Sequence, residues 1–231
     1  MASASSELQT ASSFGSGLRE PYGRALRDPS RVLYLRDAHL DAPAEPVRVE
    51  VERFLAAADA GDTSLVAQTA GPVLDVGCGP GRMVRAAIMA GHLALGVDVS
   101  ATAVRLGQEH GLPVLRRSVF QSLPAEGDWG TVLLIDGNIG IGGDPAVLLA
   151  RCGELVDAPT GRILVETHPD PVRDRIFVGV VVDDLDHESL PFPWAEVGAR
   201  ALRAYAIAAG LVTVREWTAG GRSFTELARS G

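Results

Sequence analysis

Short apolar runs, each ended by a polar residue or a glycine, recur along the middle of the chain. They are expected to form strands at about 73–76, 93–97, 114–115, 131–135 and 161–166. Between them, apolar residues recur every three or four positions, which is the spacing of helices with one buried face. Strands that alternate with helices predict an α/β fold in which a parallel sheet is covered on both sides.

Other parts of the chain do not fit this alternation. Residues 1–18 are rich in Ser and Ala and predict a disordered tail. Residues 19–70 carry scattered apolar positions and predict an N-terminal lid with a segment that approaches the sheet. A run with strong strand character follows the fifth expected strand, so we place a small β insertion at about 171–193, within a core of 71–231. A helix is expected at 195–209, where helical spacing ends at a glycine.

A glycine-rich turn joins the first strand to the first helix of this core. It reads Asp75-Val76-Gly77-Cys78-Gly79-Pro80-Gly81. Glycine accepts positive φ and lets a ligand approach the main chain, and the following helix presents its N-terminus to the same space. Asp98 ends the second strand some 20 residues later, where a carboxylate is positioned to accept the ribose hydroxyls of a nucleoside.

Composition narrows the class of partner. A length of 231 residues and 46% hydrophobic content suit one domain, and the formal net charge of −8 argues against binding to nucleic acid or anionic membranes. The chain has no apolar run of ~18 residues that would predict a membrane span. Only Cys78 and Cys152 occur, so a disulfide framework is not expected and the cytoplasm is the predicted location.

The glycine-rich turn resembles the first motif of the class I S-adenosylmethionine-dependent methyltransferases. Dinucleotide-binding folds usually carry a further glycine, whereas this chain has Arg82 after Gly81. The resemblance implies a Rossmann-like, doubly wound, seven-stranded and mostly parallel sheet, closed by strands near 211–217 and 222–227. The stretches 136–145 and 192–194 are also similar to a group of small bacterial methyltransferases.

The resemblance implies S-adenosyl-L-methionine as the cofactor and places its site at the carboxyl ends of the strands. Ser118 stands where the family usually has an Asp that binds the adenine amino group, which is a departure from the pattern. The candidate cofactor-binding residues are Asp75, Gly77, Cys78, Gly79, Gly81, Asp98, Val99, Ser118, Val119, Asp136, Gly137 and Asn138.

Catalytic residues are expected beside this site. His168 follows the fifth strand and is the first candidate for a general base, because its usual pKa is near 6.5. Asp136 is the second candidate, and Tyr22, Tyr34 and Trp194 are candidate substrate contacts; a structural role remains open for each of them. No metal is expected, although Asp136, Asn138 and Asp170 leave a metal-assisted mechanism open.

The expected reaction is methyl transfer to the oxygen or nitrogen of a small-molecule acceptor. One alternative is a protein that binds S-adenosylmethionine as a regulator or assembly partner without methyl transfer. Another is a nicotinamide oxidoreductase, which the absence of glycine at position 82 disfavours. The sequence identifies neither the acceptor nor the oligomeric state.

Overall fold

A sheet of seven strands forms the centre of the molecule. The structure is a computed structural model that describes residues 13–16, 21–39 and 47–230. The strands lie in the order β10-β11-β7-β6-β3-β4-β5, and β11 runs antiparallel to both of its neighbours while the other pairs are parallel. They are β3 (Val73–Val76), β4 (Ala94–Asp98), β5 (Val114–Arg116), β6 (Thr131–Leu134), β7 (Arg162–Thr167), β10 (Leu211–Ala219) and β11 (Arg222–Arg229). The predicted seven-stranded, mostly parallel sheet is confirmed.

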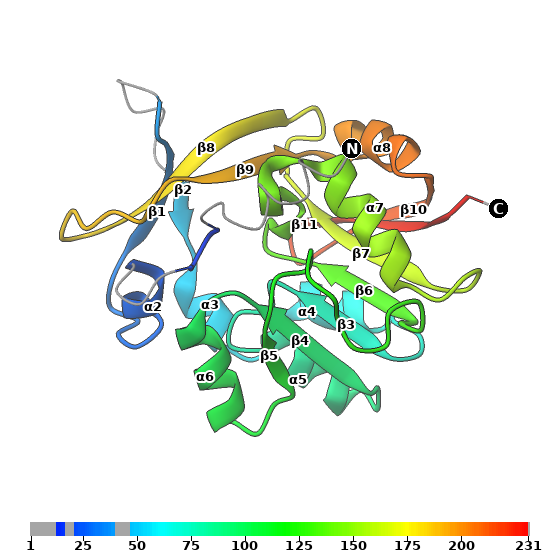
Figure 1. Cartoon of the computed structure of the whole chain (residues 1–231), viewed down its shortest axis with the longest axis horizontal. Coiled ribbons are helices and arrows are strands. Elements are labelled where there is room, and N and C mark those ends of the chain that lie inside the picture. Colours follow the sequence, from blue (N-terminus) through cyan, green and yellow to red (C-terminus); the bar gives the residue numbers. More distant parts are fainter. Residues whose placement is uncertain (1–12, 17–20, 40–46, 231) are drawn as a thin grey trace.

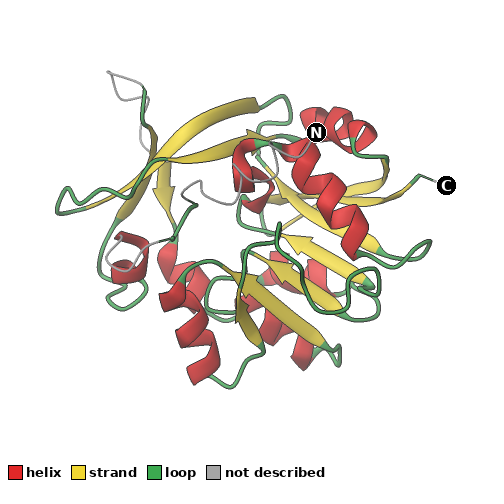
Figure 2. Cartoon of the chain, viewed as in Figure 1, coloured by secondary structure: helices red, strands yellow, loops and turns green. Residues whose placement is uncertain are grey.

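Helices cover both faces of this sheet (Figure 2). Successive side chains of a strand point to opposite faces, so Leu133 of β6 packs with residues of α4 and α5, whereas Leu134 packs with residues of α7 and α8. These helices are α4 (Ala60–Val66), α5 (Arg82–Met89), α7 (Pro145–Leu155) and α8 (Ala199–Ala208), and α6 (Ala101–Glu109) joins β4 to β5. The fold is therefore doubly wound, as predicted.

A second sheet lies to one side of the first (Figure 1). Its order is β2-β1-β8-β9, with antiparallel neighbours. Two strands come from the N-terminal segment and two from the insertion after β7, so the expected lid and the expected insertion form one sheet, which we call the roof sheet. The strands are β1 (Leu33–Asp37), β2 (Val47–Val49), β8 (Asp174–Asp183) and β9 (Phe192–Val197).

Short helices connect the roof sheet to the core. α2 (Pro21–Ala25) precedes β1, and α3 (Val51–Leu55) follows β2. An apolar cluster joins Tyr22 of α2 to Leu33 of β1 and to Trp194 of β9. The N-terminal segment is therefore packed against the insertion by side chains as well as by strand pairing.

One element boundary differs from the sequence-based expectation. The helix expected from residue 195 begins at Ala199, because residues up to Val197 pair with β8 as a strand. Pairing with a distant strand here overrides the local helical spacing. The predicted disordered tail falls mainly outside the described residues; residues 13–16 are described, and Phe14 contacts the rings of Tyr22, Phe192 and Trp194.

Candidate active site

The glycine-rich turn adopts the left-handed backbone that its sequence predicts. Gly77, Gly79 and Gly81 have φ values of 70°, 54° and 93°. The side-chain amide of Asn138 donates hydrogen bonds from Nδ2 to the carbonyls of Val76, at 2.8 Å, and Gly77, at 3.0 Å. A Cβ atom at Gly77 would lie 2.7 Å from that Nδ2 atom. The hydrogen bonds from Asn138 to the turn after β3 therefore require glycine at position 77.

Asp98 lies at the end of β4 and is bound to the same turn. Its Oδ2 accepts a hydrogen bond from the Gly79 N–H at 2.8 Å, and its Oδ1 accepts one from the Ser100 N–H at 2.7 Å. Burial raises the pKa of Asp98, while these N–H groups favour the charged form. Each oxygen keeps a further lone pair, so the carboxylate can also accept hydroxyl groups from a ligand.

Asp75 is buried at the centre of the site. It is 2% exposed, and no described residue donates a hydrogen bond to its carboxylate. Burial raises the pKa of Asp75 to about 7, and the nearby charge of Arg82 opposes this rise. A carboxyl group in this position favours a ligand that brings its own positive charge.

Five charged residues form a buried network behind the glycine turn, which we call the ion cluster: Asp62, Arg82, Asp136, Glu166 and Arg222. Arg82 donates hydrogen bonds to Asp62 and Asp136. Arg222 donates to Glu166 at 2.7 Å, to Asp62 at 2.6 Å and to Asp136 at 3.2 Å. The cluster links α4, α5, β7 and β11 to the turn after β6.

Asp136, predicted as a catalytic and cofactor-binding residue, belongs to this cluster. Its φ is 57°, and its main-chain N–H donates to Glu166 at 2.7 Å. Burial raises the pKa of its carboxyl group, and Arg82 opposes the rise. The carboxylate is thus held by arginines, while the residue still lines the cavity.

His168 follows β7, and its ring lines the same cavity. Its Nδ1 accepts a hydrogen bond from the Asp170 N–H at 3.0 Å. A neutral imidazole with an occupied Nδ1 lone pair carries its proton on Nε2. In this arrangement His168 presents a hydrogen-bond donor at Nε2, and it accepts a proton only after the contact with Asp170 is released.

A cavity of about 380 Å³ connects these residues. Its core side is formed by the turns after β3, β4 and β6, which we call the floor, and its other side includes residues of the roof sheet. Aromatic side chains line the roof side, contributed by Phe14, Tyr22, Phe54 and Trp194. The site therefore combines a polar, glycine-rich floor with an apolar roof, which is typical of small-molecule pockets.

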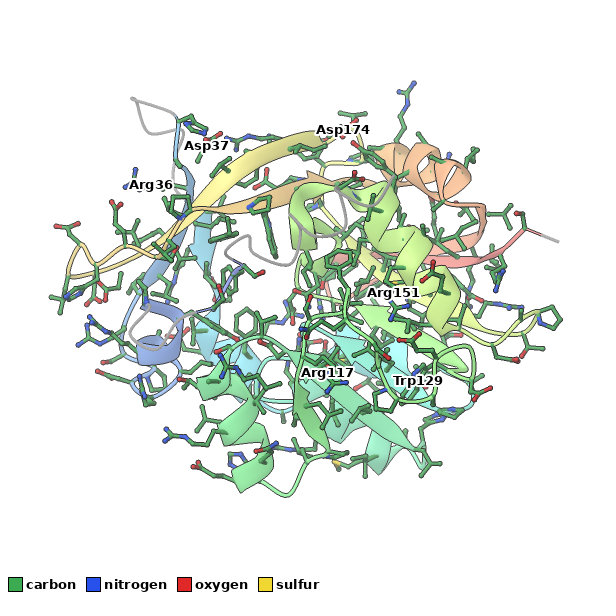
Figure 3. All side chains as sticks on the ribbon, in the orientation of Figure 1. Arg36, Asp37, Arg117, Trp129, Arg151 and Asp174 are labelled. Atoms are coloured by element: carbon green, nitrogen blue, oxygen red, sulfur yellow. The ribbon has the colours of Figure 1, made fainter. Side chains whose placement is uncertain are left out.

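Most of the predicted site residues meet at this cavity. Gly81 does not line it and instead is the N-cap residue of α5, and Tyr34 lies on β1 outside the cavity wall. The Oγ of Ser118 accepts from the Phe120 N–H at 3.3 Å, and Arg117 beside it also lines the cavity (Figure 3). The residues found in the cavity wall are Asp75, Gly77, Cys78, Gly79, Asp98, Val99, Ser118, Val119, Asp136, Gly137, Asn138, His168, Tyr22 and Trp194.

Solved structures share this architecture. A S-adenosylmethionine-dependent methyltransferase from Bacteroides fragilis, in complex with S-adenosyl-L-homocysteine, superposes with a TM-score of 0.73 at 18% identity over 94% of this chain and 100% of the other. The 1,6-didemethyltoxoflavin N1-methyltransferase of Burkholderia thailandensis gives 0.53 at 18% identity over 74% and 77%. A sugar N-methyltransferase from Streptoalloteichus gives 0.56 at 15% identity over 74% and 87%.

The chain has the S-adenosylmethionine-dependent methyltransferase fold. No model of a known protein family matches the sequence, and no curated protein matches it. The first similarity spans 94% of the chain, whereas each of the other two spans 74%.

Several residues of this methyltransferase fold were not identified as site residues from sequence. Asp62, Glu166 and Arg222 lie on α4, β7 and β11, which are separate in sequence from the glycine motif. In the sequence, Arg82 served only to disfavour a dinucleotide-binding motif, which would have a glycine at this position. Its position directly after the glycine turn could have indicated an ion pair with acidic residues of the floor. Among the described residues, no group of three metal-binding side chains is arranged as a metal site, and no helix is long and apolar enough to cross a membrane.

Proposed function

We propose that the protein transfers the methyl group of S-adenosyl-L-methionine to an oxygen or nitrogen atom of a small-molecule acceptor in the cytoplasm. The observation that carries this proposal is the cavity in which the glycine turn, Asp98 and Asp75 lie opposite the aromatic roof. The solved structures of similar fold support it, because they include a 1,6-didemethyltoxoflavin N1-methyltransferase and a sugar N-methyltransferase.

The residues of the floor fit this cofactor. Asp98 accepts the ribose hydroxyls, and Asp75, which has no hydrogen-bond donor among the described residues, accepts the ammonium group; the free lone pairs of both carboxylates support these roles. A Cβ atom at Gly79 would lie 3.1 Å from the hydroxyl of Tyr22, so glycine keeps open the narrow space between the turn and α2. When bound, the cofactor supplies an electrophilic methyl group on a sulfonium.

The remaining contribution of the chain is alignment and exclusion of water. The roof places Trp194 and Phe14 across the cavity from the floor, which shields the reacting atoms and restricts the orientation of an acceptor. Such alignment is worth up to ~7–11 kcal/mol of a reaction barrier. A protein with this fold therefore needs little covalent chemistry of its own.

We assign to His168 the contact with the acceptor atom that receives the methyl group. Its Nε2–H donates a hydrogen bond that orients the acceptor, and the ring takes a proton only when the Asp170 N–H leaves Nδ1. Two variants separate these roles, since Gln retains a donor that Ala lacks. Recovery of the turnover rate constant in His168→Gln relative to His168→Ala supports orientation, and equal loss in both supports proton transfer.

Calorimetry and product analysis test the function itself. We expect S-adenosylmethionine and S-adenosylhomocysteine to bind with measurable heat. Incubation with methyl-labelled cofactor and mixtures of candidate acceptors should yield a labelled small molecule together with S-adenosylhomocysteine, detected by mass spectrometry. Binding without any S-adenosylhomocysteine formed would instead identify a cofactor-binding regulator, and tighter binding of NAD would contradict the methyltransferase assignment.

A further inference from the structure

Trp194 differs from the other tryptophans of the chain in its indole N–H. Trp129 is 6% exposed and donates from Nε1 to the Pro124 carbonyl at 3.0 Å, and Trp217 donates from Nε1 to the Ser64 hydroxyl at 3.2 Å. Trp194 is 8% exposed, yet its Nε1 donates a hydrogen bond to no described residue. A buried indole N–H usually has an acceptor. Because Trp194 lines the cavity, its unpaired N–H indicates a place where a ligand atom binds.

Neighbouring groups fix the orientation of this indole. It contacts the rings of Phe14 and Phe192, whose centroids lie 5.7 Å and 5.9 Å away. The turn after β6 also approaches it closely, since a Cβ atom at Gly140 would lie 2.9 Å from Nε1. The glycine therefore lets the Nε1 edge of the indole lie against the main chain of this turn. A donor that packing already holds in one orientation loses little freedom when a ligand binds to it.

A second N–H donor lies in the same cavity wall. His168 presents Nε2–H there, because its Nδ1 accepts a hydrogen bond from the Asp170 N–H. The main-chain N–H of His168 donates at 2.8 Å to the carbonyl of Val197, which lies three residues along β9 from Trp194. At about 3.3 Å per residue, these two positions of β9 are roughly 10 Å apart. Donors at such positions suit a ligand of one or two fused rings with two hydrogen-bond-accepting atoms.

The charged residues of the roof disfavour an ionic acceptor. Among the described roof-sheet residues that line the cavity, Arg48 and Glu196 are charged. Glu196 accepts a hydrogen bond from Nε of Arg173 at 2.8 Å, and Arg48 lies 3.5 Å from Glu52, so each already has a partner of opposite charge. An ionic ligand against the aromatic side chains would lose its hydration without gaining such a partner. Arg117 also lines the cavity, but it follows β5 of the central sheet and does not belong to the roof.

We propose that the acceptor is an uncharged, planar heteroaromatic molecule, and that Trp194 binds it through a hydrogen bond from Nε1 to a ring nitrogen or carbonyl oxygen. This inference rests on the proposed function and names the substrate class of the same pocket. The aromatic side chains of the roof contact the faces of the rings, and Trp194 recognises an accepting atom at their edge. A molecule of the same shape without that atom leaves the N–H unpaired and binds more weakly.

The test uses pairs of probes that differ only in one ring atom. The shape of 5-hydroxyquinoline matches 1-naphthol, and those of 6- and 7-hydroxyquinoline match 2-naphthol, but only the quinolines have a ring nitrogen. Each probe is titrated by calorimetry into protein saturated with S-adenosylhomocysteine. We expect the wild type to bind at least one hydroxyquinoline roughly 3- to 10-fold more tightly than its matching naphthol. Trp194→Phe keeps an aromatic ring but lacks the N–H, so the ratio should fall to about one.

The matched control is Trp217→Phe, which removes an indole N–H that already has a partner and lies outside the cavity wall. It should keep the wild-type ratio, and circular dichroism checks the fold of each variant.

Nuclear magnetic resonance observes the hydrogen bond itself. The chain has three tryptophans and therefore three indole N–H signals in a proton–nitrogen correlation spectrum. Single Trp→Phe variants assign them, and Trp129→Phe with Trp217→Phe identifies the Trp194 signal by elimination should Trp194→Phe be unfolded. We expect the bound hydroxyquinoline to move the Trp194 proton signal farther downfield than the matching naphthol does. An equal movement with S-adenosylhomocysteine alone would assign the N–H to the cofactor and overturn the inference.

Two further probes test the charge and the shape of the acceptor. 2-Naphthoate has the same fused rings with a carboxylate, and N-acetylglucosamine is uncharged but not aromatic. Both should bind roughly tenfold or more weakly than the preferred hydroxyquinoline. Tighter binding of either probe, equal binding of quinolines and naphthols by the wild type, or an unchanged ratio in folded Trp194→Phe overturns the inference.

The same titrations separate this inference from the proposed function. Protein that binds S-adenosylhomocysteine but none of the probes overturns the inference and leaves the proposed function standing. Protein that does not bind S-adenosylhomocysteine overturns both.

Discussion

The floor and the roof of the cavity differ in how far apart along the chain their parts lie. The floor is made by turns that follow neighbouring strands, and a single local motif supplies Gly77 and Gly79. The roof depends on pairing between β1 of the N-terminal segment and β8 of the insertion (Figure 1). In this pairing, Leu33 lies opposite Asp183. The floor carries the glycine turn and acidic side chains, and the roof side carries aromatic side chains.

This difference separates two functions within one pocket. Cofactor recognition requires fixed backbone geometry, which a short glycine motif encodes. In the proposed function, the acceptor is recognised by side chains of Phe14, Tyr22 and Trp194, which come from three separate segments. Variants of the two regions should therefore affect different measurements, and four predictions test this.

The largest effect is expected where the floor is supported by buried charge. Arg222→Met leaves Glu166, Asp62 and Asp136 with one cation fewer, and an uncompensated buried charge costs about 3–5 kcal/mol of unfolding free energy. Urea unfolding measures this loss. Arg203→Met removes an exposed ion pair and should cost about 1 kcal/mol or less. Equal losses in the two variants would show that the ion cluster does not support the floor.

A matched pair of leucines tests whether roof and floor unfold separately. Leu33 of β1 and Leu74 of β3 are both 0% exposed, so replacement by Ala should cost about 2–5 kcal/mol at either position. In Leu33→Ala, hydrogen exchange should quicken in β1, β2, β8 and β9 while β3, β4 and β6 stay protected. A uniform increase across both sheets would contradict this division and indicate one cooperative unit.

Sequence reasoning succeeded where structure is local. The strand-turn-helix around Gly77 and the acidic end of β4 at Asp98 follow from hydrophobic runs and turn residues, and the structure has them as predicted. The seven-stranded, mostly parallel sheet was implied by the resemblance to methyltransferases and is confirmed. The candidate residues at these strand ends also meet at one cavity, with Gly81 and Tyr34 outside its wall. Their roles in binding and catalysis remain predictions.

Sequence reasoning failed where contacts are distant. Nothing in residues 33–37 indicates that they pair with residues 179–183. A helix was expected from residue 195, although residues 195–197 continue the strand that pairs with β8. The ion cluster was missed for the same reason, since Asp62 and Arg222 are 160 residues apart along the chain and meet only in the folded structure.

Gly77→Ala changes the floor alone. The added Cβ must occupy a φ of 70° and would lie 2.7 Å from Nδ2 of Asn138, so it disrupts the two hydrogen bonds that Asn138 donates. At about 1 kcal/mol for each bond, the affinity for S-adenosylhomocysteine should fall roughly 10- to 30-fold in calorimetry. Gly91→Ala is the matched control, because its φ of 92° is equally unfavourable to Ala but no atom lies within 4 Å. Loss of affinity in both variants would assign the effect to stability rather than to the turn.

The smallest expected effect is a pH dependence of ligand binding that arises from Asp75 in the floor. The folded-state pKa of Asp75 is raised by burial to about 7, above the value of 3.8 in an unfolded chain, so the folded protein holds the extra proton between these values. The contribution of Asp75 to stability is therefore lost as pH rises from about 4 to about 7. A ligand ammonium group favours the charged carboxylate, so binding below pH 7 must release this proton.

Affinity for S-adenosylhomocysteine should then increase with pH by at most about tenfold per pH unit below pH 7 and level off above it. Calorimetry in buffers of different ionisation enthalpy measures the released proton directly. Asp75→Asn should bind more weakly and lose this pH dependence, although burial also raises the pKa of Asp98. A dependence that persists in Asp75→Asn would assign the proton to Asp98 or another group. Because Asp75 lies on β3 in the floor, Leu33→Ala in the roof should retain the wild-type pH profile of binding. A changed profile in Leu33→Ala would mean that the roof affects the pKa of Asp75.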